Sequence, residues 1–235
     1  MKELTKEQYL PGVVNSIEVK YPLIRQQSKG PTFALQYMGT AYTLHKRGGF
    51  PMDKALAIEA GFRDLYAVSE QFNASNTEFM QKHGFIECAF GLKLRTPIIS
   101  RCILGTSKTP YAAEAEARSA NNAVTQSWGM LLNRAIIATD NRIEAAGYAT
   151  DIFPINMIHD AGYFLVRDTP EHVQFLNQVL IEEMEWNDID TIRSTDVPMK
   201  ASLEIGKSWD KLHAIPNNAP LEKIINVLAT INRST

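Results

Sequence analysis

Two short apolar runs on either side of a polar turn limit the fold more than any other feature of this sequence. The runs occupy residues 155–158 and 163–166, and the turn occupies residues 159–162. This pattern predicts a buried antiparallel hairpin, because two apolar runs of this length that meet at a tight turn usually pair. A helical pattern over residues 112–146 precedes the hairpin, and a helix start at Thr169 follows it. Antiparallel strands with helices packed against them define an α+β fold.

The rest of the chain is mostly helical in pattern up to about residue 110 and mixed after it. We therefore expect a boundary that separates residues 1–110 from residues 111–235. Residues 103–111 have the composition of a loop. The other predicted elements are a helix over residues 51–82, two short extended pieces around a glycine turn at 84–95, an edge strand over 197–205 and an amphipathic helix over 220–231.

Composition and charge argue against a membrane partner and leave a nucleic-acid partner open. With 24 Lys and Arg against 26 Asp and Glu, the net charge is −2, so the chain has no overall basic field, although a single cleft can still be basic. Cys88 and Cys102 lack metal-ligand spacing, which favours a reducing cytoplasm. The charged first residues do not form a signal peptide, and no run of about 18 apolar residues exists. We expect a cytoplasmic protein without a membrane partner.

A row of two cations and two aromatic residues is the first candidate site. Successive members lie four residues apart, which places them along one side of a helix, and they are Arg25, Lys29, Phe33 and Tyr37. Cations followed by rings suit a nucleoside triphosphate, because the cations meet phosphates and the rings meet sugar and base. The alternative is a solvated basic turn that runs into a core stripe. Gly30 and Pro31 interrupt a simple helix, so we expect Arg25 on a preceding turn.

Two further groups of polar residues are candidate sites. Arg118, Asn122 and Gln126 also lie at steps of four, and such a row can follow sugars, phosphates and minor-groove base edges. The alternative is an ordinary solvated helix face. His159 and Asp160 lie at the tip of the predicted hairpin, where a carboxylate points to solvent or to a metal such as Mg²⁺. The alternative there is a common turn aspartate.

Taken together and in order, these groups resemble the motifs of the family A DNA polymerases, phage-type members included. The resemblance covers about residues 20–213. Its elements are the fingers-helix motif from Arg25 to Tyr37, a glycine-arginine turn from Gly84 through Gly91 to Arg95, the palm-helix row from Arg118 to Gln126, the His159-Asp160 pair, and the closing strand and tail at residues 197–209.

The resemblance implies a fold, an activity and a set of residue roles. Residues 1–110 would be a helical fingers subdomain, and residues 111–235 the C-terminal part of a palm with an antiparallel sheet. The implied activity is addition of dNTPs to a primer 3′-end with Mg²⁺ as cofactor. The implied catalytic residues are Asp160, Lys29 and Arg25, with Asp160 as metal ligand. The implied nucleotide-binding residues are Arg25, Lys29, Phe33 and Tyr37, and the implied DNA-binding residues are Arg95, Arg118, Asn122, Gln126 and His159.

Three departures from the family pattern shape the expected partners. Ala161 stands where the family usually has Glu, and Met38 stands where it usually has Gly. The first catalytic aspartate of the family precedes the fingers helix, yet the 24 residues before Arg25 contain no Asp. We therefore expect a split or truncated enzyme, in which an N-terminal polymerase chain supplies this motif, the thumb and possibly an exonuclease. Two alternatives remain: a catalytically inactive DNA-binding relic or accessory subunit, and a fragment of a single-subunit RNA polymerase.

Overall fold

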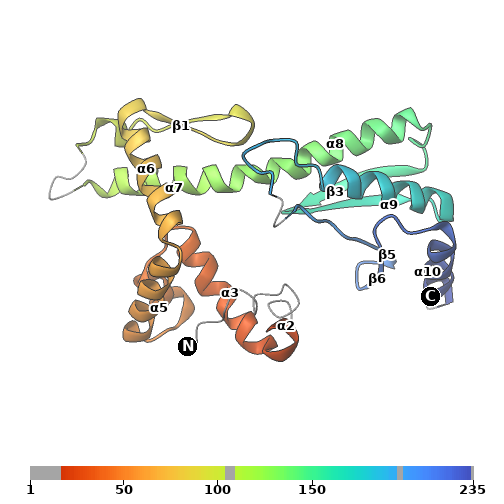
Figure 1. Cartoon of the computed structure of the whole chain (residues 1–235), viewed down its shortest axis with the longest axis horizontal. Coiled ribbons are helices and arrows are strands. Elements are labelled where there is room, and N and C mark those ends of the chain that lie inside the picture. The colour runs from red at the N-terminus through yellow and green to blue at the C-terminus, as the bar shows by residue number, and fades with distance from the viewer. Residues whose placement is uncertain (1–16, 104–108, 195–197, 234–235) are drawn as a thin grey trace. The chain divides into compact units, whose positions relative to one another are not determined.

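The computed structural model describes residues 17–103, 109–194 and 198–233, and contacts divide the chain into two compact units. The units are Met1–Ser127 and Trp128–Thr235. Both combine helices with antiparallel strand pairs (Figure 1), so the α+β class is confirmed. The division falls at residue 127 rather than near 110, because helix α7 (Tyr111–Gln126) packs on elements that precede it in the chain.

The first unit is a series of helices followed by a short hairpin and a further helix. Before α7, its described elements are α2 (Ile17–Lys20), α3 (Pro22–Gln36), α4 (Ala41–Gly48), α5 (Met52–Leu65), α6 (Ala67–His83), β1 (Phe85–Glu87), η2 (Ala89–Gly91), β2 (Lys93–Arg95) and η3 (Ile99–Arg101). The β1–β2 pair confirms the extended pieces predicted at 84–95. The predicted loop at 103–111 lies largely outside the described residues, and α7 begins at its last position.

Two long helices predicted from the sequence are each broken. The helix over 51–82 divides at Tyr66, whose ring packs on Phe62 with 4.6 Å between centroids. Neither Gly nor Pro lies at this bend, so the sequence carries no helix-breaking residue that marks it. The helix over 112–146 stops at Gln126, and the 3₁₀ turn η4 (Ser127–Gly129) follows. The Ser127 hydroxyl donates to the carbonyl of Val124 at 2.7 Å, a local bond that competes with the helix.

Two groups of buried side chains hold the first unit together. One lies among α3, α4 and α5, and it contains Leu35, Ala41, Leu44, Ala55 and Phe62. The other joins α6, β1, η3 and α7, and it contains Met80, Ile86, Ile99, Ala113, Ala117 and Ala120. The alanines on α7 allow its backbone to come close to α6, which fixes the helix that carries the second candidate row.

The second unit places the predicted hairpin between helices. Its elements are α8 (Met130–Ala145), β3 (Ile152–Ile158), β4 (Ala161–Val166), α9 (Pro170–Met184), β5 (Leu203–Ser208), β6 (Lys211–Ile215) and α10 (Leu221–Arg233). Strands β3 and β4 pair in antiparallel register with a bulge between Pro154 and Asn156. The predicted pairing of the hairpin strands, the helix start at Thr169 and the last helix are confirmed. The expected burial of the hairpin is wrong for β3, because every residue of this strand after Ile152 is exposed. Buried residues from α8, β3 and α9 form the core beneath the hairpin.

The edge strand predicted over 197–205 is wrong in extent and number. Residue 197 lies outside the described residues, and the observed strands β5 and β6 form a hairpin with its turn at Trp209 and Asp210. Gly206 is required where these strands meet, because a Cβ atom there would lie 2.1 Å from the carbonyl oxygen of Lys211. The Trp209 ring stacks on Tyr163 with 4.8 Å between centroids, so it joins the tip of the β5–β6 hairpin to strand β4.

Candidate functional site

Helix α3 carries the cationic and aromatic row predicted from the sequence. Arg25, Lys29 and Phe33 all lie within this helix, and Tyr37 is its C-terminal cap. The expectation that Arg25 lies on a preceding turn is wrong, because α3 continues through Pro31. Proline leaves the carbonyl four residues earlier without an intrahelical donor, but that residue is exposed to solvent, where water can serve. Lys29 and Phe33 are exposed and Arg25 is half-buried, so the row is open to a ligand.

The end of α3 is closed by a Schellman motif directly after Tyr37. The Gly39 N–H donates to the carbonyl of Ala34 at 2.8 Å, and the Met38 N–H donates to that of Leu35 at 2.9 Å. Met38 has a φ of 59°, a left-handed conformation that glycine adopts more easily. The departure from the family's Tyr-Gly pair therefore leaves methionine in the position where the backbone favours glycine.

Helix α7 brings the second candidate row into contact with the first. Asn122 donates from Nδ2 to the main-chain carbonyl of Tyr37, with 3.3 Å between the two atoms. Arg118 and Asn122 are half-buried, whereas Gln126 is exposed at the end of the helix. Two residues that lie 85 positions apart in the sequence thus connect the two rows.

Sequence reasoning missed Asn121, the residue that fixes α7 against α6. Asn121 is 2% exposed, and its Oδ1 accepts a hydrogen bond from Nδ2 of Asn76 at 3.0 Å. Its Nδ2 donates to the hydroxyl of Thr77 at 3.2 Å and to the carbonyl of Asn73 at 3.3 Å. Burial of a side-chain amide destabilises the fold unless the amide is hydrogen-bonded. This set of bonds therefore determines how α7 is rotated about its axis. The only sign of this role in the sequence is the pair of adjacent asparagines, Asn121 and Asn122, within a helical pattern.

Arg95 and the glycine turn occupy the short hairpin of the first unit. Arg95 pairs with Phe85 across the strands, and its side chain is exposed. Phe90 and Gly91 both have positive φ values, 57° and 76°, which turn the chain between the strands. The hairpin thus presents Arg95 to solvent, as a phosphate contact requires.

Asp160 lies at the tip of β3–β4 in the second unit. Ile158 pairs with Ala161, which leaves His159 and Asp160 as a two-residue turn. His159 has a φ of 55°, and tight two-residue hairpin turns use such a positive φ at their first position. The carboxylate of Asp160 is exposed. Close packing supports this tip, because a Cβ atom at Gly162 would lie 2.5 Å from Cδ1 of Ile136 on α8.

The same hairpin leaves large apolar side chains uncovered. Within the described residues its sheet contains β3 and β4 alone. The exposed side chains include Phe153 (45%), Ile155 (48%), Met157 (48%) and Leu165 (60%). A sheet with such side chains and with open strand edges resembles a surface that another segment covers.

Asp160 fits Mg²⁺ as a single ligand. Mg²⁺ prefers carboxylate oxygens, and it commonly takes one or two of them together with water and substrate phosphates. Among the described residues, no three His, Cys, Asp or Glu side chains gather in a metal-type cluster. A complete site thus needs oxygen ligands from outside the hairpin.

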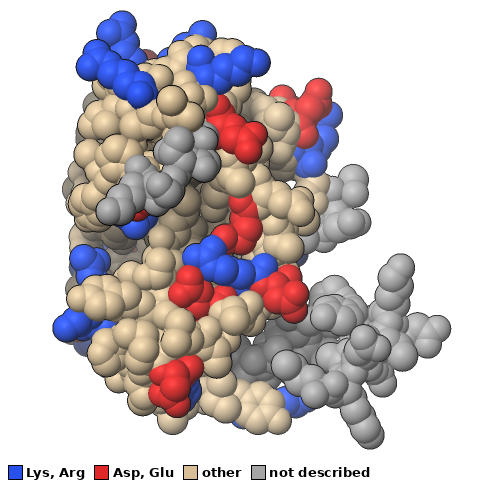
Figure 2. All heavy atoms as spheres, turned by 90° about the vertical axis from the view of Figure 1, so that its left-hand side faces the viewer, with Lys and Arg blue, Asp and Glu red and all other residues tan. Residues whose placement is uncertain are grey.

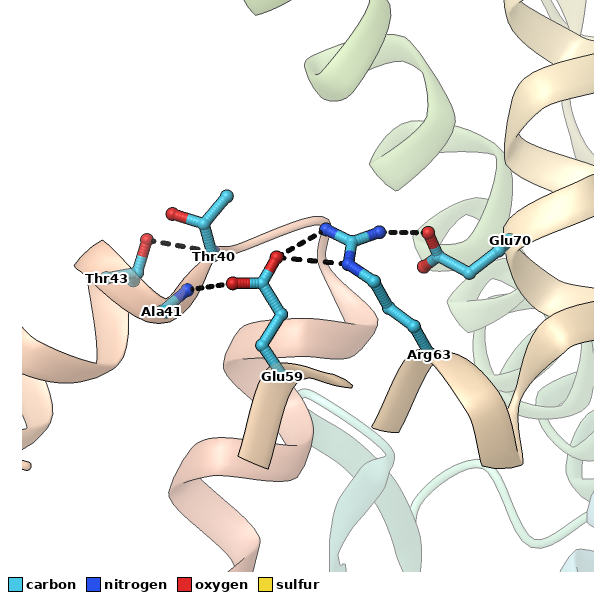
Figure 3. A network of polar contacts seen from close by, with 6 residues as sticks. All are labelled: Thr40, Ala41, Thr43, Glu59, Arg63 and Glu70. Carbon is cyan, nitrogen blue, oxygen red and sulfur yellow. Dashed lines mark hydrogen bonds and ion pairs between the residues drawn. The ribbon is translucent and has the colours of Figure 1, made fainter. Parts of the chain in front are cut away.

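A network of ion pairs fixes the chain just beyond the α3 row (Figure 3). Glu59 of α5 accepts the N–H of Ala41, in the first turn of α4, at 2.5 Å, and it accepts two bonds from Arg63 at 2.8 and 3.0 Å. Arg63 also pairs with Glu70 of α6. The hydrogen bond to Glu59 is the main cause that raises the pKa of Arg63 above its ordinary value, so this side chain stays charged. Three helices are therefore tied together at one corner.

Charge is distributed locally rather than over a whole face. On the face shown in Figure 2, Lys and Arg side chains gather at the upper edge, and lower down they stand next to Asp and Glu. Within the described residues, no helix has both the length and the apolar character needed to cross a bilayer.

Comparison with known proteins identifies the family. Residues 13–211 match the family model of DNA polymerase family A, so the chain belongs to this family. Among curated proteins, the chain is similar to DNA polymerase I of Borreliella burgdorferi, with 22% identity over 192 residues. That match covers 82% of this chain and 20% of the relative, so the chain spans about a fifth of its length.

A solved structure supports the fold. The chain resembles the POL domain of Pol1 from M. smegmatis, described in complex with DNA primer-template and dNTP. The TM-score is 0.62 at 21% identity, and the match covers 80% of this chain and 32% of that one. The expected family and fold class are thus confirmed, whereas the roles of individual residues stay predictions.

Proposed function

We propose that this chain is part of a DNA-directed DNA polymerase that holds the incoming dNTP on α3 and the primer-template along α7. The row on α3 carries this proposal, because it offers cations and aromatic rings from one helix, with Lys29 and Phe33 exposed. Arg25 and Lys29 would neutralise the triphosphate and the departing pyrophosphate. Phe33 would contact the sugar and base, and Tyr37 would close the templating position.

The roles on DNA follow from exposure and position. Arg95 and His159 are exposed, and each lies at a strand end or turn where a phosphate can approach. Arg118 and Gln126 would follow the sugars and base edges of the primer-template, and Asn122 lies between them on α7. The family match favours this activity over the RNA polymerase alternative.

Asp160 would provide one ligand for Mg²⁺, and other ligands must come from elsewhere. When bound, Mg²⁺ neutralises charge on the phosphate oxygens of the reacting groups. A second carboxylate would come from outside these 235 residues, either from another chain or from another part of a longer one. Among the described residues no further strand pairs with β3–β4, and its apolar side chains are exposed; both observations support this view, because a further palm strand would cover this sheet.

Nucleotide binding by the chain itself tests the proposal without a partner. Lys29→Ala and Arg25→Ala each remove a charge-assisted contact, so dTTP should bind roughly 10- to 150-fold more weakly. Equilibrium dialysis with labelled dTTP measures this, and Lys82→Ala, at an exposed position on α6, is the matched control. Primer-template affinity should change little. A loss of DNA binding with dTTP binding intact would mean that α3 serves another purpose.

A second candidate function is an inactive DNA-binding subunit. Ala161 next to Asp160 favours it, because the turn carries a single carboxylate. The two functions differ in primer extension. A live enzyme extends a primer once the segment with the missing aspartate is added, whereas an inactive subunit binds primer-template and never extends it.

A further inference from the structure

The contact between Asn122 and Tyr37 gives Asn122 a role that its place in the DNA-binding row does not explain. The Nδ2 group of Asn122 lies 3.3 Å from the carbonyl oxygen of Tyr37, and Asn122 is half-buried. That carbonyl is at the C-terminal cap of α3, where helix carbonyls lack intrahelical donors. The amide therefore holds the main chain of the residue that is proposed to close the templating position.

Asn121 makes this contact specific. Its buried bonds to Asn73, Asn76 and Thr77 lock α7 to α6. The next residue along a helix is rotated by about 100°, so a fixed Asn121 also fixes the direction in which Asn122 points. Asn122 thus transmits the position of α6 to the end of α3.

A second series of contacts connects α6 to the chain on the C-terminal side of Tyr37. Met38, Gly39 and Thr40 connect Tyr37 to α4, and the first turn of α4 is held by Glu59 through the N–H of Ala41. Glu59 is held by Arg63, which pairs with Glu70 of α6 (Figure 3). The segment around Tyr37 is therefore braced against α6 from both directions.

Resting on the proposed function, we propose that Asn122 is a positioning residue for Tyr37 and acts on nucleotide binding rather than as a contact to DNA. Its side-chain donor holds the Tyr37 carbonyl, so the 38%-exposed Tyr37 side chain keeps a fixed place next to Phe33 on the α3 row. Loss of the donor would free the cap and lower the affinity of this row for a dNTP.

The test uses the whole chain with Asn122→Asp, which keeps the shape of the side chain but removes both donors, and Asn122→Ala, which adds no charge. Hydrogen exchange at the Met38 and Gly39 amides should become about tenfold faster in both variants, because these amides close the turn at Tyr37. Dialysis should show dTTP bound about 5- to 10-fold more weakly, with primer-template affinity unchanged. Asn133→Asp, the same change at an exposed position of α8, should match wild type in every measurement.

A double-mutant cycle with Tyr37→Ala shows whether Asn122 acts through Tyr37. Without the Tyr37 ring, Asn122→Asp should change the dTTP affinity less than twofold. An equal loss in both backgrounds would overturn the proposal, as would wild-type exchange and affinity in both Asn122 variants or a loss confined to DNA binding. If the wild-type chain binds no dTTP, the proposed function fails and this role fails with it. If Lys29→Ala weakens dTTP but the Asn122 variants do not, the inference alone is overturned.

Discussion

The N–H of Gly39 donates to the carbonyl of Ala34 at 2.8 Å, and this bond ends α3 directly after Tyr37. Gly39 lies so close to Ala34 that it has no room for a side chain, because a Cβ atom at Gly39 would lie 2.4 Å from the same carbonyl oxygen. The place where the candidate nucleotide row stops is thus determined by one glycine.

Gly39→Ala should therefore destabilise the first unit. Overpacking of a rigid backbone contact costs about 1–3 kcal/mol, and here the clash is with backbone rather than with a flexible side chain. Urea unfolding followed by circular dichroism measures the change. Gly61→Ala is the control, since an added Cβ atom meets nothing within 4 Å inside α5 and should stabilise the unit by roughly 0.5–1 kcal/mol. Equal behaviour of the two variants would contradict the close approach.

Glu59→Gln should loosen the corner between α4, α5 and α6. The neutral amide loses the charge-assisted bonds to Arg63 and to the N–H of Ala41, which together are worth roughly 1–3 kcal/mol. The midpoint of urea unfolding should fall, and exchange of the Ala41 amide should become faster. Glu78→Gln, an exposed position on α6, should change neither quantity. An unchanged midpoint would show that the Glu59 network contributes no stability.

The sequence alone predicts those helices and strands whose first and last residues are determined by local interactions. Turn residues and apolar runs predicted the β3–β4 hairpin, and Thr169 and Pro170 predicted the start of α9. The bend at Tyr66 was missed, because no helix-breaking residue marks it; a ring contact to Phe62 and an ion pair between Arg63 and Glu70 accompany it in the structure. The β5–β6 hairpin was missed because Trp209 and Asp210 are not the residues that usually mark a two-residue turn.

Arg118→Ala and Gln126→Ala should weaken primer-template binding and leave dTTP binding intact. Arg118 loses a charge that can meet a phosphate, and Gln126 loses an amide that can meet base edges. Fluorescence anisotropy with a labelled primer-template measures the affinity, which we expect to fall roughly 5- to 50-fold, or about 1–2.3 kcal/mol. Lys223→Ala, an exposed position on α10, is the control. If the two variants and the control bind alike, this side of α7 is an ordinary solvated face.

The candidate site was predictable as separate rows but not as a connected structure. Spacing by four residues predicted that Lys29 and Phe33 share one side of a helix, and the polar turn predicted Asp160 at a hairpin tip, but Pro31 led to the wrong expectation that Arg25 precedes this helix. The bond from Asn122 to Tyr37 joins residues 85 positions apart. No local pattern encodes it, since it depends on how α7 packs on α6.

Asp160→Asn should abolish primer extension and preserve the fold. The two side chains have nearly the same shape, so the two-residue turn between Ile158 and Ala161 should survive. An amide supplies no negative oxygen for Mg²⁺, and Ala161 leaves no neighbouring carboxylate to replace it. We expect a fall of at least ~10³-fold in the rate of incorporation, or ~4 kcal/mol.

Single-turnover incorporation on one primer-template makes this comparison, with the chain combined with the segment that supplies the second aspartate. Asp64→Asn, an exposed position on α5, should keep the wild-type rate. DNA affinity of Asp160→Asn should stay equal or rise slightly, because one negative charge near the phosphates is removed. If Asp160→Asn keeps more than about a tenth of the wild-type rate, which is under ~1.4 kcal/mol, Asp160 is not a metal ligand in catalysis. The carboxylate that holds the metal together with the second aspartate would then lie elsewhere than at this hairpin tip.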